Sequence, residues 1–132
     1  MDYKTYQKEK YPTLDIRTPD NTNGYWIEYN TRLKNIYIIH KKDRGFMDLT
    51  FTNAADQLAK LEKSLDWMRH KTNRNISIQK TSKSAAIRIE VPTIESDTNF
   101  NDLNEETIKD IFDSAKILNG FANMIADIKE LV

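Results

Sequence analysis

Apolar and polar residues alternate along three successive segments in the first half of the chain. Segments 25–30, 35–41 and 46–51 place aromatic or branched aliphatic residues at every second position. A period of two with such residues is typical of a half-buried β-strand. The connection Lys42–Gly45 ends in a glycine, which suits a hairpin turn. The pattern therefore predicts an antiparallel meander of three strands.

A helical period follows directly after the third segment. Asn53 is the predicted N-cap, and the basic residues Arg69–Lys71 occupy the last turn, where they complement the helix dipole. Between them, apolar residues recur at steps of three and four, which predicts one buried stripe. The stripe consists of Ala54, Leu58, Leu61, Leu65 and Met68.

The second half predicts two further strands and a long helix. The strands span 75–80 and 85–91, and the turn 81–84 joins them. After Pro92 the chain reads as a polar loop, and a helix follows from about 102 to 131. Asn119–Gly120 predicts an interruption of that helix, because glycine costs roughly 1 kcal/mol relative to alanine inside a helix.

These elements predict one α+β domain over residues 1–132. Its order is β-β-β-α-β-β-α: an antiparallel sheet of about five strands, with two long helices packed on one face. Residues 2–11 could form a short N-terminal helix that stops before Pro12. The N-terminal segment 1–24 otherwise reads as loop, and 25–132 holds the sheet and helices. Strand order is not readable from the sequence.

Composition narrows the classes of function. The chain has no cysteine, which excludes disulfides, thiolate metal sites and cysteine nucleophiles. Its longest apolar run, Ile36–Ile39, is far too short to cross a bilayer, and the N-terminus lacks the apolar region of a secretory signal. We therefore expect a cytoplasmic protein that does not contact membranes.

The zero net charge conceals an uneven distribution. Residues 1–89 carry 17 Lys and Arg against 10 Asp and Glu, whereas residues 90–132 carry 3 against 10. The excess is therefore +7 in the first part and −7 in the second. Such a split can indicate an anionic partner, or an acidic C-terminal part that neutralises a basic body internally.

The chain offers little for catalysis. Two histidines and three glycines supply neither a converging metal-ligand set nor a phosphate-binding loop, and no serine lies in a nucleophile elbow. Asp48 stands out because it lies mid-strand among apolar residues. It could hold a metal, or pair with an arginine such as Arg88 from another strand of the same face. We predict no catalytic residue, no metal site and no cofactor.

The positive candidate is a dispersed basic surface. Cationic turns beside an aromatic residue on a sheet can bind phosphates while rings stack on bases, so DNA or RNA is the expected partner. Lysine-rich turns are also simply soluble turns. The candidate nucleic-acid residues are Lys41, Lys42, Arg44, Arg69, Lys71, Arg74, Lys80, Lys83, Tyr37 and Arg88.

The C-terminal helix supports a competing hypothesis. Its apolar positions cover more of its circumference than one sheet needs, so it either lies within the core or forms an interface with a second copy or a partner protein. The residues that would form this interface are Ile117, Phe121, Met124 and Ile128.

Four short motifs carry a family resemblance: Trp26–Tyr29, Ile36–Ile39, Leu61–Trp67 and Arg74–Ile76. Over about residues 20–131 the chain resembles a bacterial domain of unknown function that is often found after a PD-(D/E)XK nuclease-like domain. That family shows a tryptophan-led strand, a second apolar strand, a helix ending in a tryptophan motif, an Arg-x-Ile strand and a final long helix. The resemblance implies a nuclease-associated accessory module in DNA-related or defence-related proteins, without an established reaction.

The nuclease motif itself is absent from this chain. Asp48 could serve as its first acid, but Ser77–Lys80 lacks the acidic residue two positions before the lysine, and Asp127–Lys129 falls in the predicted last helix. The sequence therefore favours a non-catalytic accessory module that contacts nucleic acid through basic turns. A protein-interaction or homodimerisation module is the alternative.

Overall fold

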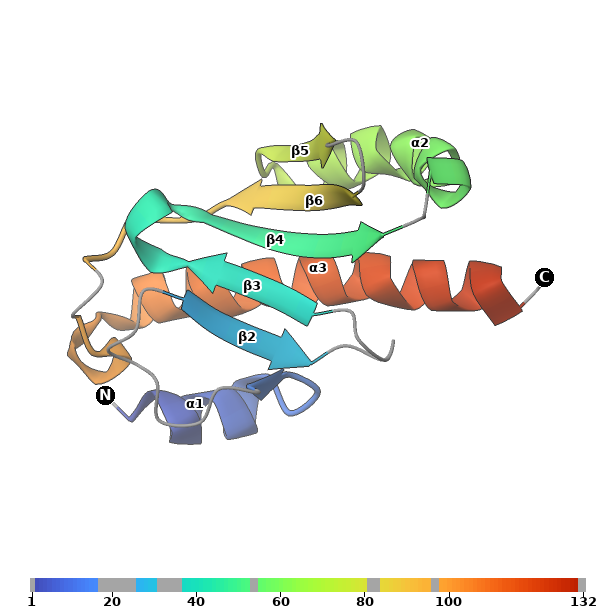
Figure 1. Ribbon diagram of the computed structural model, residues 1–132. Helices are drawn as coiled ribbons and strands as arrows, with labels where there is room; N and C mark the ends of the chain where they lie inside the picture. Colours follow the sequence, from blue (N-terminus) through green and yellow to red (C-terminus); the bar gives the residue numbers. More distant parts are fainter. Residues whose placement is uncertain are drawn as a thin grey trace.

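A computed structural model describes residues 2–16, 26–30, 37–52, 55–80, 84–95 and 98–130. Four strands follow the N-terminal helix, and a long helix then separates them from the last two strands (Figure 1). The elements are α1 (Tyr3–Lys10), β1 (Asp15–Ile16), β2 (Trp26–Asn30), β3 (Tyr37–Lys41), η1 (Lys42–Arg44), β4 (Phe46–Thr52), α2 (Ala55–Thr72), β5 (Ile76–Lys80), β6 (Ser84–Glu90), η2 (Phe100–Asp102) and α3 (Glu105–Glu130).

The strands form one antiparallel sheet in the order β1-β2-β3-β4-β6-β5. The predicted α+β class and antiparallel pairing are confirmed. The sheet has six strands in the described residues rather than about five, because Asp15 and Ile16 pair with Asn30 and Tyr29. The segment expected to be loop thus contributes an edge strand, and two residues are too few to display a period of two.

Register places the apolar residues of four strands on one side of the sheet. Ile38 pairs with Leu49, Leu49 with Ile87, and Ile87 with Ile78. Ile38, Leu49 and Ile87 are fully buried, and Ile78 is partly buried against the core. Because a slip by one residue would turn this apolar set toward solvent, its burial specifies the register.

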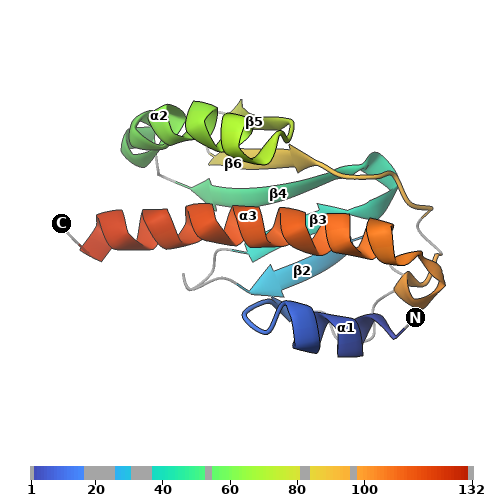
Figure 2. The ribbon, with the colours of Figure 1, turned by 180° about the vertical axis from the view of Figure 1, so that it is seen from behind.

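Helix α3 lies across this inner face, and α2 lies on the same side along β5 and β6 (Figure 2). One apolar face of α3 is buried, with Ile108, Ile111, Ala115, Leu118 and Ala122 in the core. Asn104 caps the helix, since its side-chain oxygen accepts a hydrogen bond from the Thr107 amide at 2.8 Å.

The expected interruption at Asn119–Gly120 is wrong, because α3 continues to Glu130. A Cβ placed on Gly120 would meet no atom within 4 Å, so the glycine answers no steric demand there. The buried neighbours Leu118, Phe121 and Ala122 offset its small helical penalty.

The short N-terminal helix α1 is present and contacts the start of α3. Asp2 caps it by accepting a hydrogen bond from the Lys4 amide. The Tyr3 amide donates to Asn101 Oδ1 at 2.9 Å, and the Tyr11 hydroxyl donates to Asp113 at 2.5 Å. These contacts join the N-terminal segment to the helix at the other end of the sequence.

Candidate nucleic-acid interface

Two of the predicted basic turns lie at one end of the sheet. Phe46, at the start of β4, pairs with Glu90, and the Glu90 amide donates to the Asn75 carbonyl just before β5. The η1 turn and the segment after α2 therefore join β4 and β5 about two strand spacings apart, roughly 10 Å. Lys80 lies at the opposite end of β5, and its side chain falls outside the described part, as does Lys83 altogether. The candidate set is thus not one surface.

The η1 turn contains a lysine that is fully buried. Lys42 Nζ donates to the Thr98 carbonyl at 2.8 Å and lies 5.5 Å from the centroid of the Phe100 ring. The Ile94 amide also donates to the Lys42 carbonyl, so the segment after β6 covers this turn. The interpretation of Lys42 as a phosphate ligand is wrong, because its charge is already satisfied inside the protein.

Its neighbours in the same turn differ in exposure. Arg44 is exposed, whereas Lys41 is half-buried with Nζ 5.9 Å from the Phe46 ring centroid. Gly45 ends the turn at a φ of 69°, a conformation that favours glycine. This turn therefore presents one or two cations rather than three.

Beside it, His40 is buried on the inner face of β3. Burial, and secondarily the charge of Lys42, lowers the pKa of its imidazole to about 3. Neither ring nitrogen has a hydrogen-bond partner among the described residues. His40 is a neutral core side chain, and no base or ligand role follows from it.

The open face of the sheet carries the predicted pairing of Asp48. Arg88 Nε and Nη2 donate to its two carboxylate oxygens at 2.8 and 3.0 Å, across the register pair Asp48–Arg88. The Arg88 guanidinium also lies 3.7 Å from the centroid of the Phe46 ring. Hydrogen bonding to Asp48 raises the pKa of Arg88. The proposed cross-strand ion pair is confirmed, and Arg88 is held within the protein instead of being available to a phosphate.

The end of α2 differs from the η1 turn because its side chains face solvent. Trp67 is 59% exposed, and no other large hydrophobic residue is exposed among the side chains that the structure describes. Lys71 Nζ lies 4.6 Å from the centroid of the Trp67 ring. Arg69 and His70, in the same stretch of the helix, are also exposed. An accessible aromatic ring thus lies beside a cation one helical turn further along α2.

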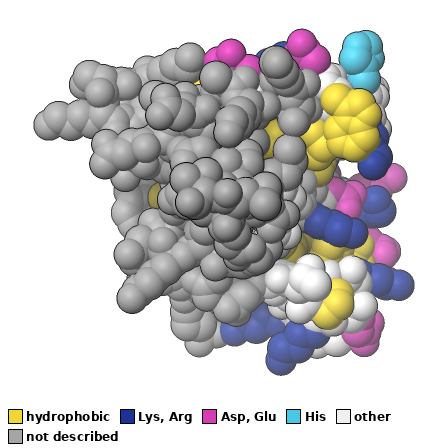
Figure 3. All heavy atoms as spheres, turned by 90° about the vertical axis from the view of Figure 1, so that its right-hand side faces the viewer, with side chains coloured by type: hydrophobic (Ala, Val, Ile, Leu, Met, Phe, Trp, Pro, Cys, Tyr) yellow, Lys and Arg dark blue, Asp and Glu magenta, His cyan; other side chains and the backbone are white. Residues whose placement is uncertain are grey.

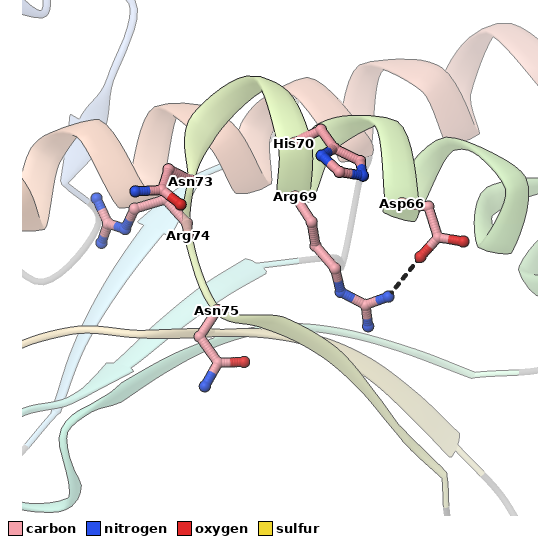
Figure 4. Close-up of a pocket in the computed structure, with 6 residues that line it drawn as sticks. All are labelled: Asp66, Arg69, His70, Asn73, Arg74 and Asn75. Atoms are coloured by element: carbon pink, nitrogen blue, oxygen red, sulfur yellow. Dashed lines mark hydrogen bonds and ion pairs between the residues drawn. The ribbon is translucent and has the colours of Figure 1, made fainter.

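A hollow of about 420 Å³ adjoins this helix end (Figure 4). Arg69 and Arg74 both line it, with guanidinium groups that point away from each other in Figure 4, and both groups already have partners. Arg69 Nε donates to the Ile76 carbonyl at 2.6 Å and its Nη1 pairs with Asp66 at 2.8 Å. Arg74 points toward α3, where it pairs with Asp110 at 2.6 Å and donates to Ser114. The residues lining the hollow are Asp66, Arg69, His70, Asn73, Arg74 and Asn75.

Trp67 is not among the predicted contact residues, although the apolar pattern contained the signal. Leu65 is buried and Met68 is partly buried against the core. Trp67 is two residues after Leu65, about 200° around the helix, and therefore points away from the sheet. Tyr37, which was selected, belongs to β3, but its side chain lies outside the described part.

The alternative interface on α3 is largely occupied by the core. Phe121 is fully buried and Ile117 is partly buried against the core, so a partner could not reach Phe121 without opening the domain. Assigning Phe121 to an interface is therefore wrong. Met124 and Ile128 belong to α3, but their side chains fall outside the described part.

The described residues contain no group of three or more His, Cys, Asp or Glu that could hold a metal ion. None of the helices, within the same residues, combines the length and apolarity needed to cross a membrane. Comparison with known proteins found no family model, no curated protein and no solved structure that matches this chain.

Proposed function

We propose that this domain is a non-catalytic module that contacts single-stranded nucleic acid through the end of α2. The carrying observation is the 59% exposed ring of Trp67 with Lys71 Nζ 4.6 Å from its centroid. The contact residues are Trp67, Arg69, His70 and Lys71, and Arg44 supplies a more distant cation at the same end of the sheet.

The chemistry of this surface fits unpaired bases. An aromatic ring that faces solvent can stack on any base, and stacking contributes roughly 1–3 kcal/mol per base in single-strand complexes. Bases inside a duplex are already stacked on one another, so they do not offer their faces to a protruding indole. Lys71 lies close enough to the ring to contact an adjoining phosphate.

The charge around this surface limits the strength of the contact. Asp66 pairs with Arg69, and Figure 3 shows Lys and Arg side chains interspersed with Asp and Glu over the described part of one face. With two or three phosphates neutralised, affinity for a single strand would fall by about tenfold between roughly 50 and 200 mM salt. A surface of one sign would give a much steeper dependence.

The test is fluorescence anisotropy with labelled single- and double-stranded DNA and RNA at those two salt concentrations. We expect saturable binding to single strands, weakened about tenfold or more by Trp67→Ala, because one stacked base is lost. Lys71→Glu should weaken binding and flatten the salt dependence. Lys8→Glu is the matched control, since Lys8 is an exposed lysine on α1, which lies at the opposite edge of the sheet from α2 (Figure 1).

Absence of binding to any of these nucleic acids at low salt would overturn the proposal. Equal loss with Lys71→Glu and Lys8→Glu would also contradict it, because only the overall charge would then matter. In either case a protein-interaction module would become the leading function, with Trp67 as the anchor of an interface.

The resemblance to nuclease-associated domains supports this proposal, because an accessory module of that kind would work beside DNA. The setting that we propose with it is a DNA-related or defence-related bacterial protein in the cytoplasm. Catalysis is not part of the proposal: Ser114 is buried and bonded to Arg74, and His40 is buried and neutral.

A further inference from the structure

Strand β5 forms one edge of the sheet, and part of its backbone faces outward without a partner. The Glu90 amide donates to the Asn75 carbonyl, so residues 75, 77 and 79 direct their backbone groups toward β6. The groups of 76, 78 and 80 therefore point away from the sheet. Among the described residues, no hydrogen bond reaches the backbone N–H or C=O of Ile78.

The two ends of this edge differ. At the start of β5, Arg69 occupies the outward carbonyl of Ile76. This bond closes the first position of the edge and holds the guanidinium group beside it. The edge thus combines unbonded backbone groups at Ile78 with the guanidinium group of Arg69, which is held at Ile76, two residues earlier in the strand.

The hollow at the end of α2 adjoins the closed position. Its lining supplies the donors of Arg69, His70, Asn73 and Asn75, with Asp66 as its one carboxylate. Arg69 Nη1 donates to Asp66 and Nε donates to the Ile76 carbonyl, which leaves Nη2 without a partner among the described residues. An incoming carboxylate would find a guanidinium N–H and amide donors there.

We propose that the β5 edge binds an extended peptide that carries an acidic residue, with the peptide backbone paired to Ile78 and its carboxylate in the hollow beside Arg69. Extended segments commonly add to exposed sheet edges in this way, with main-chain hydrogen bonds giving affinity and side-chain pockets giving specificity. The acidic residue follows from the donors of the hollow, because a carboxylate pairs with arginine more strongly than a neutral amide does.

The test uses a short fluorescein-labelled peptide of alternating valine and threonine that ends in glutamate, and a matched peptide that ends in glutamine. The glutamate peptide should bind about tenfold more tightly, the effect of one charge-assisted hydrogen bond. Arg69→Ala should abolish that preference without weakening the glutamine peptide, since it also uncovers the Ile76 carbonyl. A preference that survives Arg69→Ala would overturn the placement of the carboxylate.

Ile78→Pro tests the backbone pairing. Proline removes an outward N–H that the ladder to β6 does not use, and edge positions of this kind tolerate it. Peptide binding should fall about tenfold or more, while single-strand binding stays unchanged. Conversely, Trp67→Ala and Lys71→Glu should leave peptide binding intact, so failure of either proposal is distinguishable from failure of the other.

A second measurement holds even if Ile78→Pro fails to fold. Peptides with N-methyl groups on alternate residues block one backbone edge and leave the other open. Only one of the two methylation registers should bind the unmodified protein. Equal binding of both registers would overturn the edge proposal, and so would a concentration-dependent dimer that excludes the peptide.

Discussion

The η1 turn and the end of α2 are both short basic segments at the same end of the sheet, yet they place their charge in opposite environments. In η1, Lys42 is fully buried and its ammonium group is bonded to the Thr98 carbonyl. At the end of α2, Lys71 is exposed and lies over the exposed ring of Trp67. Positive charge in a turn therefore does not by itself indicate a binding surface. The charge is available to a partner only where no other segment of the chain covers the turn.

The largest expected effect comes from removing the buried charge. Lys42→Ala should lower the free energy of unfolding by about 2–4 kcal/mol, because it leaves a cavity and an unsatisfied carbonyl at Thr98. Urea denaturation measures this loss. Lys71→Ala is the matched lysine at the other site, and its effect should stay within about 0.5 kcal/mol. Similar losses in the two variants would break the comparison.

The neighbouring His40 predicts a pH dependence that the α2 end should not share. Its folded-state pKa is about 3, against 6.5 for an unperturbed histidine. Between these two pH values the unfolded chain binds a proton that the folded protein does not. The free energy of unfolding therefore decreases as the pH is lowered from 6.5 toward 3, by up to about 1.4 kcal/mol per pH unit. His40→Leu should flatten the curve measured between pH 6.5 and 4. A curve parallel to that of the unmodified protein would contradict burial of a neutral imidazole.

Gly45→Ala probes how closely the covering segment approaches η1. A Cβ at this position would lie 2.5 Å from Thr93 Oγ1 and would also sit at a φ of 69°. We expect a loss of about 1–3 kcal/mol in thermal or urea unfolding. Thr93→Ala combined with Gly45→Ala should recover the steric part. If the double variant is no more stable than Gly45→Ala alone, the whole loss comes from the backbone conformation.

The smallest effect is expected on the open sheet face, where a charged pair is only partly buried. Asp48 and Arg88 side chains are 14% and 30% exposed. A double-mutant cycle with Asp48→Ala and Arg88→Ala should give a coupling energy of about 1 kcal/mol. A coupling energy several times larger would mean that partial burial shields this ion pair from water as effectively as full burial shields Lys42.

Much of the fold could be predicted from local patterns. Strand alternation, the buried stripe on α3 and the Asp48–Arg88 pairing all follow from residues that share a strand face or a helix face. Burial of Lys42 could not be predicted, because its partner Thr98 is 56 positions away and reaches it only through the path taken after β6. Strand β1 was missed since it depends on pairing with β2 and not on its own two residues.

The site shows the same division between local and tertiary information. Exposure of Trp67 was readable, because the stripe formed by Leu65 and Met68 already determines which side of α2 faces the sheet. The interface role of Phe121 failed for a tertiary reason. Both apolar sides of α3 were visible in the sequence, but only the structure shows how much of them the core occupies.

The contacts of α1 have a consequence for the order in which the domain forms. The Tyr3 amide meets Asn101, 98 positions later, and the Tyr11 hydroxyl meets Asp113, 102 positions later. During synthesis the first helix therefore leaves the ribosome long before its partners exist. Closing so long a loop is entropically unfavourable and slow. Until α3 emerges, the apolar face of Ile38, Met47 and Leu49 has no cover, so the nascent chain passes through a stage in which chaperones or other chains can bind it.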